Sequence, residues 1–289
     1  MNQKNALPNY KNKAYGAAWS IYDNESINFL NNIQSEKGNI NQFLTDYKNW
    51  IGLDFTGYSN VNFSAGTTET FDKFYHRHLG KRLRIFKGEY FYHQIMGRNY
   101  FEIEWLENSA IKENDFVVMS CPFADTGNMP KNFYSILESC DKLDVPVLLD
   151  LAYINISNLM NINLNYNCIK TITTSLSKVF PIEHHRIGIR FDRDYIDDTL
   201  NAYNQNNYVN LYSVHIGHSF IKKFSNDWLY KKYQAAQLSI CKKLNVKPSD
   251  CVIFGLAEQG HFDEYHRGGS VNRLCFSRIW DGRVNAETN

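Results

Sequence analysis

The chain has 289 residues, 43% of them hydrophobic, so it can bury either one large core or a large and a small one. Its 31 lysines and arginines nearly balance its 30 aspartates and glutamates, and the net charge of +1 excludes overall electrostatic attraction to nucleic acid or to a membrane surface. Any recognition of phosphate must therefore be local.

The apolar runs and the cysteines further limit the class of protein to which the chain can belong. No apolar run approaches the roughly 20 residues of a membrane span, and the first residues lack the apolar core of a signal peptide. We therefore expect a cytoplasmic protein without a membrane partner. The six cysteines form no C-x-x-C pair, so we expect buried thiols and no metal site.

Residues 25–53 carry apolar side chains at helical spacing, interrupted by Gly38. This pattern predicts two helices. We therefore expect residues 1–54 to form an N-terminal helical segment.

From about residue 60, short β-rich runs alternate with helical ones. Continuous apolar runs such as VPVLLDL (145–151), separated by helices, favour a parallel sheet covered on both faces. We therefore expect an α/β large domain at residues 55–193. The predicted strands are 61–63, 82–86, 115–120, 145–151, 171–175 and 186–191, and the predicted helices are 68–78 and 130–142.

The pattern changes again beyond residue 194. Residues 228–244 read as a helix, and 251–256 and 271–280 read as strands. These elements predict a small α+β C-terminal domain at residues 194–289.

Ligands of parallel sheets bind beyond the carboxyl ends of the strands, so the residues after each strand are informative. SAGTTET (64–70) leads into a helix whose N-terminus suits a phosphate, although it is equally an ordinary helix cap. Asp150 ends an apolar run, where a carboxylate needs a cation or hydrogen-bond donors. Asp150 is therefore either a functional carboxylate that a cation or donor meets, or a structural residue that caps a loop.

Lys178 follows the predicted strand 171–175 and precedes Arg186. A lysine near the end of a buried strand can have a lowered pKa and become the nucleophilic amine that a Schiff base requires. Taken by itself, Lys178 is more simply interpreted as a solvated lysine.

Together these positions show a resemblance to a known family. The stretch S-L-S-K at 175–178, followed by R-I-G at 186–188, resembles the S-x-S-K…R-x-G signature of fold-type I pyridoxal 5'-phosphate (PLP) enzymes, specifically the aspartate aminotransferase superfamily of class I/II aminotransferases. D-L-A-Y at 150–153 is similar to that family's D-x-A-Y element. The resemblance covers residues 60–191 well and the C-terminal part thinly.

The resemblance implies roles for the lysine and its neighbours. Lys178 would form the Schiff base with PLP, while Ser175 and Arg186 would hold the cofactor phosphate. Asp150 would pair with the protonated pyridine nitrogen, which preserves the electron sink of the ring. Tyr153 would hydrogen-bond the phenolic oxygen of the cofactor.

The same resemblance implies three further contacts. SAGTTE would give Gly66, Thr67 and Thr68 to the phosphate. KGEYFYHQ (87–94) would place an aromatic ring on the cofactor, with Tyr90 the first candidate and Tyr92 the second, and a core aromatic is the alternative for either. VNRLCFSR (271–278) resembles the strand whose arginine binds the substrate carboxylate, which implies Arg273, with Arg278 as competitor.

The sequence departs from the family in three places. The loop that commonly reads N-P-x-N-P-T-G is here CPFADTG (121–127), so Ala124 replaces the asparagine that usually contacts the phenolic oxygen. The span from Arg186 to Arg273 is short, which implies a trimmed small domain and a shortened member. The tyrosine that a neighbouring subunit usually lends has no clear counterpart.

We therefore expect a PLP-dependent aminotransferase that acts on an amino acid or related amine as a homodimer. A PLP-dependent lyase, decarboxylase, racemase or oxidase of a biosynthetic pathway is the alternative, because Ala124 leaves the reaction open. A non-enzymatic binding module is a third reading, which the joint presence of Lys178, Asp150, Tyr153 and Arg186 opposes. Residues 261–267, with His261, His266 and Arg267, are either a lid near the substrate or a solvated loop.

Overall fold

The computed structural model describes residues 15–280. Its main feature is a seven-stranded sheet with the order β1-β7-β6-β5-β4-β2-β3. All neighbouring pairs are parallel except those that β7 makes with β6 and β1, so β7 alone is reversed. The strands are β1 (Asn60–Ala65), β2 (Arg82–Ile85), β3 (Ile103–Trp105), β4 (Asp115–Ser120), β5 (Val147–Asp150), β6 (Ile169–Ser175) and β7 (Ile187–Asp192).

Helices cover both faces of this sheet. Along β4, Phe116 and Val118 pack in one apolar cluster with Phe71 and other residues of α3, whereas Val117 belongs to a second cluster that includes residues of α2, α5 and α7. The predicted doubly covered α/β sheet is therefore confirmed. The helices that follow from the sequence are α1 (Asn24–Asn32), α2 (Ile40–Trp50), α3 (Thr67–Arg77) and α5 (Phe133–Lys142).

The structure also contains elements that the sequence patterns did not predict. They are α4 (Phe91–Tyr100), β3, α6 (Thr199–Gln205) and α7 (Leu211–Lys223). The aromatic residues at the start of α4 favour strands, but Gly97 lets this helix pack closely on Ile103, where a Cβ would overlap the isoleucine side chain. Tertiary packing therefore overrides local propensity there.

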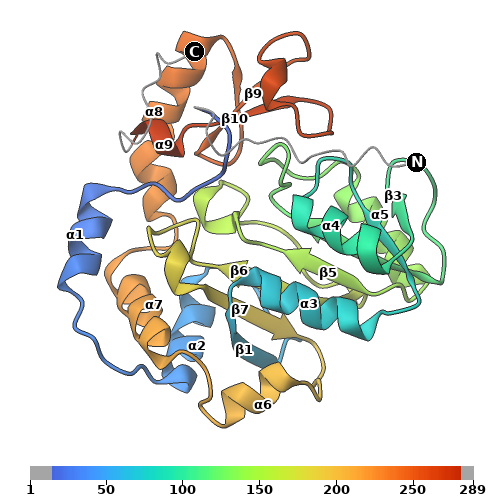
Figure 1. Ribbon diagram of the computed structural model, residues 1–289, viewed down its shortest axis with the longest axis horizontal. Helices are drawn as coiled ribbons and strands as arrows, with labels where there is room; N and C mark the ends of the chain where they lie inside the picture. The colour runs from blue at the N-terminus through green and yellow to red at the C-terminus, as the bar shows by residue number, and fades with distance from the viewer. Residues whose placement is uncertain (1–14, 281–289) are drawn as a thin grey trace.

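The C-terminal part forms a small antiparallel sheet with the order β10-β9-β8 beside the long helix α8 (Trp228–Leu244). Figure 1 shows β9, β10 and α8 above the large sheet. The predicted strand at 271–280 is only half correct, because it ends at β10 and continues as the short helix α9. The bounds are β8 (Lys247–Pro248), β9 (Phe254–Ala257), β10 (Asn272–Cys275) and α9 (Ser277–Trp280).

The helices at the two ends of the large domain lie together. In Figure 1, α2 and α7 run side by side at the lower left, and the contacts between elements place α2 on β1 and α7 on β7. Helix α6, which follows the predicted boundary at residue 193, also contacts β1. The exact domain boundaries stay a prediction. None of the helices within residues 15–280 is long and apolar enough to cross a membrane.

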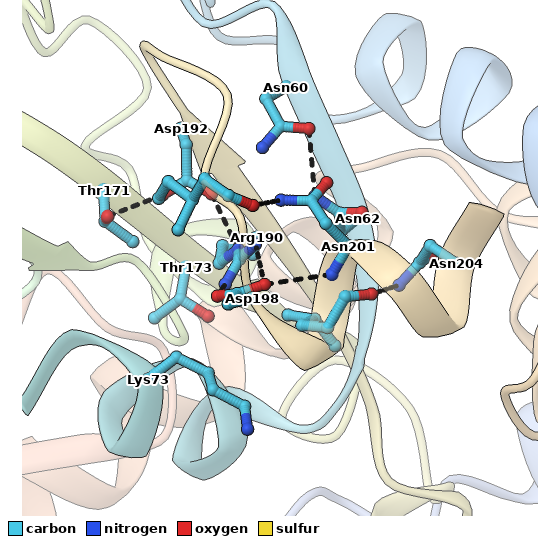
Figure 2. A network of polar contacts seen from close by, with 12 residues as sticks. Asn60, Asn62, Lys73, Thr171, Thr173, Arg190, Asp192, Asp198, Asn201 and Asn204 are labelled. Carbon is cyan, nitrogen blue, oxygen red and sulfur yellow. Dashed lines mark hydrogen bonds and ion pairs between the residues drawn. The ribbon is translucent and has the colours of Figure 1, made fainter. Parts of the chain in front are cut away.

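A buried polar network fastens α6 to the sheet (Figure 2). Arg190 lies between two carboxylates, with Nε 2.7 Å from Oδ2 of Asp192 and Nη1 2.5 Å from Oδ2 of Asp198. Thr171 donates to Asp192 over 2.6 Å, and Asp198 caps α6 by accepting from the N–H of Asn201 over 3.0 Å. Asp192 ends β7, whereas Arg186 precedes it, so this network lies at the opposite edge of the sheet from the predicted site.

Candidate active site

The predicted site residues converge because of the strand directions. Asp150, the last residue of β5, pairs with Ser120 at the end of β4 and with Thr173 near the end of β6. Ser175, the last residue of β6, pairs with Gly188 near the start of the reversed strand β7. The carboxyl ends of the parallel strands and the segment before β7 therefore meet at one edge of the sheet.

Gly66 and Arg186 form one side of this edge. Gly66 has φ +84° and ψ 174°, a combination that only glycine adopts readily, and a Cβ there would overlap the Arg186 guanidinium. A Cβ at Gly188 would lie 2.8 Å from Cα of Gly66, so both glycines allow a close approach. Arg186 Nη2 donates to the Thr68 hydroxyl over 3.2 Å.

Helix α3 starts at Thr67, and its N-cap residue Gly66 offers no side-chain oxygen to the first N–H groups of the helix. These amides and the Arg186 guanidinium together present positive charge at the same place. The geometry of Gly66, Thr67, Thr68 and Arg186 can therefore hold a phosphate.

The two serines before Lys178 differ in their bonding. Ser175 Oγ donates to the carbonyl of Ile187 over 3.2 Å and accepts from the N–H of Ser177 over 3.1 Å. Ser177 Oγ is buried and has no hydrogen-bond partner among residues 15–280. Ser177 was part of the motif but not among the predicted site residues, and its hydroxyl is the better placed of the two to donate to a ligand.

Lys178 is half-buried, and its Nζ donates to the backbone carbonyl of Ala18 over 2.6 Å. Burial lowers the pKa of Lys178 to about 8, and the charges of Arg273 and Arg186 act in the same direction. The amine is therefore half neutral near pH 8, far below the pH at which an ordinary lysine becomes a nucleophile.

The segment that supplies Ala18 is fixed by a carboxylate. Glu183 accepts from the Ser20 hydroxyl over 2.8 Å and from the Tyr22 hydroxyl over 2.6 Å. Residues 18–22 therefore form a strap that reaches Lys178, with Glu183 as its anchor. No local sequence pattern indicates this contact, because the two segments lie about 160 residues apart.

Asp150 is only 7% exposed, and burial raises its pKa to about 7. The neighbouring Glu89 also raises this pKa, while the N–H of Ala152 and the charge of Lys178 lower it. Glu89 is itself buried and accepts hydrogen bonds from the Ser120 N–H over 3.0 Å, the Ser120 hydroxyl over 2.5 Å and the Tyr90 N–H over 2.9 Å. Glu89, absent from the sequence predictions, thus ties Tyr90 to the end of β4.

The two candidate aromatic residues point to different partners. Burial and the charge of Asp150 raise the pKa of Tyr90, while Arg186 and Arg267 lower it, so Tyr90 lies within the charge cluster. Tyr92 stacks on Tyr90 at 6.2 Å but donates its hydroxyl to Asp72 of α3. Of the two rings, the structure therefore brings Tyr90 to the other site residues.

Tyr153 and Arg273 lie near each other, on the side of the site that faces the C-terminal sheet. Burial raises the pKa of Tyr153 to about 12, and the charges of Arg273 and Arg267 oppose this rise. Arg273 is 1% exposed, lies 4.3 Å from the centre of the Phe254 ring and donates through Nη1 to the carbonyl of Ala124. Its Nε is buried without a hydrogen-bond partner in the part of the chain that the structure describes.

The other predicted positions fall as follows. Arg278 lies in α9, half-buried and outside the strand that carries Arg273. The charge of Arg267 lowers the pKa of Tyr90 and of Tyr153, so this arginine of the segment 261–267 lies near the site residues. The six cysteines are all buried and free, as predicted, and no group of three or more histidine, cysteine, aspartate or glutamate side chains within residues 15–280 is placed to hold a metal ion.

Comparison with known proteins identifies the fold. No protein-family profile matches this sequence, and no curated protein matches it. Solved structures do match: tyrosine aminotransferase from Leishmania infantum aligns with a TM-score of 0.69 and 10% identity over 99% of this chain and 98% of that chain. The PLP-bound C-S lyase from Staphylococcus hominis aligns with a TM-score of 0.67 and 13% identity over 96% of this chain and 92% of that one.

A third match is L-threonine-O-3-phosphate decarboxylase from Porphyromonas gingivalis, with a TM-score of 0.60 and 14% identity over 90% of this chain and 92% of that chain. The chain therefore has the fold of the fold-type I, class I/II aminotransferase-like proteins, and the fold predicted from the sequence is confirmed. The names of these three proteins describe three different reactions, so this fold by itself does not select one reaction.

Proposed function

We propose that the protein is a PLP-dependent aminotransferase that acts on an amino acid or related amine. One observation carries the proposal: an amine of lowered pKa, Lys178, lies at the same edge of the sheet as the buried carboxyl of Asp150 and the anion cradle of Gly66 and Arg186. No single one of these features specifies a cofactor, but PLP needs all three.

The chemistry of these groups fits PLP. The glycine at 66 leaves room for a phosphate oxygen beside Arg186, and the Ser177 hydroxyl has hydrogen-bonding capacity to spare. Asp150 is a buried carboxyl whose pKa is raised for lack of a cationic partner, which a protonated pyridine nitrogen would supply. When bound, PLP supplies an aldehyde that condenses with amines and a cationic ring that stabilises negative charge on an adjacent carbon.

The roles of the residues follow. The first N–H groups of α3, with Thr67, Thr68 and Arg186, would hold the phosphate, and Ser175 and Ser177 lie at the same edge. Asp150 would keep a proton on the ring nitrogen. Tyr153 would donate its hydroxyl proton to the phenolic oxygen, since its raised pKa keeps it protonated.

Tyr90 would cover one face of the ring and exclude water from it. Its backbone N–H donates to the Glu89 carboxylate, which is itself bound to Ser120 at the end of β4, so the backbone that carries the ring is held at this edge of the sheet. Glu89 is therefore a positioning residue in this proposal.

Lys178 would act twice. Its neutral Nζ would be the nucleophile toward the cofactor aldehyde; once the substrate amine has replaced it, the free amine would take a proton from the substrate α-carbon and deliver it to the former aldehyde carbon of the cofactor. A pKa near 8 suits both tasks close to neutral pH, because the amine can then take up and give back a proton. The Ala18 carbonyl orients this amine by accepting its hydrogen bond.

Arg273 would bind the substrate carboxylate. Its guanidinium is buried, stacks on Phe254 and retains an unused Nε donor, and a buried charged donor strongly favours a carboxylate partner. We further propose that the protein is a homodimer, as the resemblance implies, and that it is cytoplasmic, as expected from its sequence.

Ala124 supports a second candidate. It offers the phenolic oxygen no side-chain donor, and its carbonyl already accepts from Arg273, so Tyr153 would be the main donor there. This change in hydrogen bonding favours testing a PLP-dependent lyase or decarboxylase alongside the aminotransferase.

In the test, the purified protein is titrated with PLP while its absorbance is recorded near the boundary between the ultraviolet and the visible range. We expect a band that Lys178→Ala abolishes and that Lys170→Ala, a change at a lysine paired only with the exposed Asp144, leaves intact. Absence of the band from the unmodified protein would contradict the proposal. Incubation with amino donors should then yield the pyridoxamine form, whereas bound PLP that no donor converts would favour the second candidate.

A further inference from the structure

The loop after β4 carries a buried carboxylate that the proposed chemistry does not use. Asp125 is 0% exposed and directly follows Ala124, whose carbonyl accepts from Arg273. A carboxylate is expensive to bury without a reason. Its position beside the residue that contacts the substrate arginine suggests a role in what this arginine can bind.

Two glycines make the space for this side chain. Gly88, with φ +83°, lies so close that a Cβ there would be 2.9 Å from both Cβ and Cγ of Asp125. A Cβ at Gly269 would overlap Oδ2 of the same carboxylate. Three segments therefore meet at the Asp125 carboxylate: the turn after β2, the loop after β4 and the C-terminal segment. Because Gly88 and Gly269 have no side chains, the first and the last of these segments leave room for the carboxylate.

The groups that face Asp125 are mostly cationic. Arg267 approaches with Nε 4.0 Å from Oδ1, farther than a direct hydrogen bond, and its side chain is 14% exposed. Burial raises the pKa of Asp125 to about 6, and Arg273, Arg267 and His266 oppose this rise in that order. The buried Glu89 adds a further negative charge nearby, since Asp125 contributes to raising its pKa.

The two arginines carry two positive charges, and Asp125 offsets one of them. We propose that Asp125 is a specificity-determining residue: it is a built-in carboxylate that uses part of the binding capacity of Arg267 and Arg273, so the site accepts substrates with one carboxylate and rejects those with a second acidic group. This inference rests on the proposed function, because it takes Arg273 as the substrate arginine.

The physical reason is repulsion in a buried site. A substrate with one carboxylate meets the arginine charge that Asp125 does not offset, whereas the second acidic group of a dicarboxylate would be brought toward Asp125 away from water. Rejection of the wrong ligand by an internal like charge is an established way to gain specificity.

The test compares propionate and succinate as probes, with one and two carboxylates, by calorimetric titration of the PLP-loaded and the PLP-free protein. Asp125→Asn keeps the shape of the side chain and removes its charge. We expect Asp125→Asn to tighten succinate binding by about tenfold or more, while propionate binding changes by less than about threefold. The reason is that the substitution removes a negative charge that repels only the second carboxylate, which propionate lacks. The ratio of the two affinities is therefore the readout.

Asp144→Asn is the matched control, since Asp144 is exposed and has φ +48°, a conformation that asparagine tolerates equally well. If Asp125→Asn does not fold, as judged by circular dichroism, Asp125→Ala gives a second route to the same measurement.

An unchanged ratio, or an equal loss of both affinities, would overturn the proposal and leave Asp125 as a structural anchor of the loop. Because the binding is also measured without PLP, this outcome is distinct from failure of the Lys178 absorbance test.

Discussion

Replacement of Gly66 by alanine tests the anion cradle most directly. Its φ of +84° and ψ of 174° cost a residue with a Cβ about 1–3 kcal/mol of folding free energy. In addition, the new Cβ would overlap the Arg186 guanidinium and push it away from the position where we place the phosphate. Loss of one charged hydrogen bond of about 1.5–3 kcal/mol predicts PLP binding weaker by roughly 10- to 150-fold.

Gly80→Ala separates the two effects. Gly80 has φ +85°, but a Cβ there would have no neighbour within 4 Å. We expect both variants to lower the free energy of unfolding, measured by urea denaturation, whereas only Gly66→Ala weakens PLP binding in an absorbance titration. Equal PLP affinities for the two variants would refute the placement of the phosphate beside Arg186.

Three further predictions concern buried charges. Because the pKa of Lys178 is lowered to about 8, the rate at which the PLP-free protein captures PLP should rise with pH, reach half its plateau near pH 8 and level off above it; a rise centred near the ordinary lysine value of 10.5 would contradict this. The pKa of Asp150 is raised from 3.8 to about 7, so its contribution to stability is complete below pH 4 and is lost as the pH rises through 7. Asp150→Asn should therefore stabilise the PLP-free protein at pH 8 by up to about 4 kcal/mol in urea denaturation and by nothing near pH 4, and a pH-independent difference would count against the assignment. Arg190→Leu should destabilise the fold by about 3–5 kcal/mol, because it removes the closest cation of Asp192 and Asp198 and leaves Asp192 only the more distant Arg77, at 3.9 Å; a loss below about 1 kcal/mol in thermal or urea unfolding would show that the network in Figure 2 contributes little.

The sequence carried much of the site because the main groups lie in short local motifs. The S-L-S-K run places Lys178 three residues after the end of β6, and D-L-A-Y places Asp150 at the end of β5. Apolar runs without polar alternation indicated strands buried on both faces, and the two-sided packing of β4 bears this out. These patterns depend on neighbours in the chain, so a sequence reveals them.

The choice between similar residues needed the fold. Tyr90 and Tyr92 are two positions apart, and the fold separates their environments: Tyr90 lies near Asp150 and Arg186, whereas the Tyr92 hydroxyl donates to Asp72 of another helix. Helix α4, which carries Tyr92, was not predicted because its aromatic residues have no marked preference for a helix and are held in place by contacts with distant strands.

By itself, the sequence determined the class of fold, the lysine and the carboxylate that belong at the ends of adjacent strands, and the glycine that precedes α3. The tertiary structure alone decided which distant groups surround them: the strap anchored by Glu183, the carboxylate of Glu89 beside Asp150, and Asp125 between the arginines of the C-terminal segment. Their effect arises from burial and from charges brought together by chain reversals, and neither is encoded in any local pattern of residues.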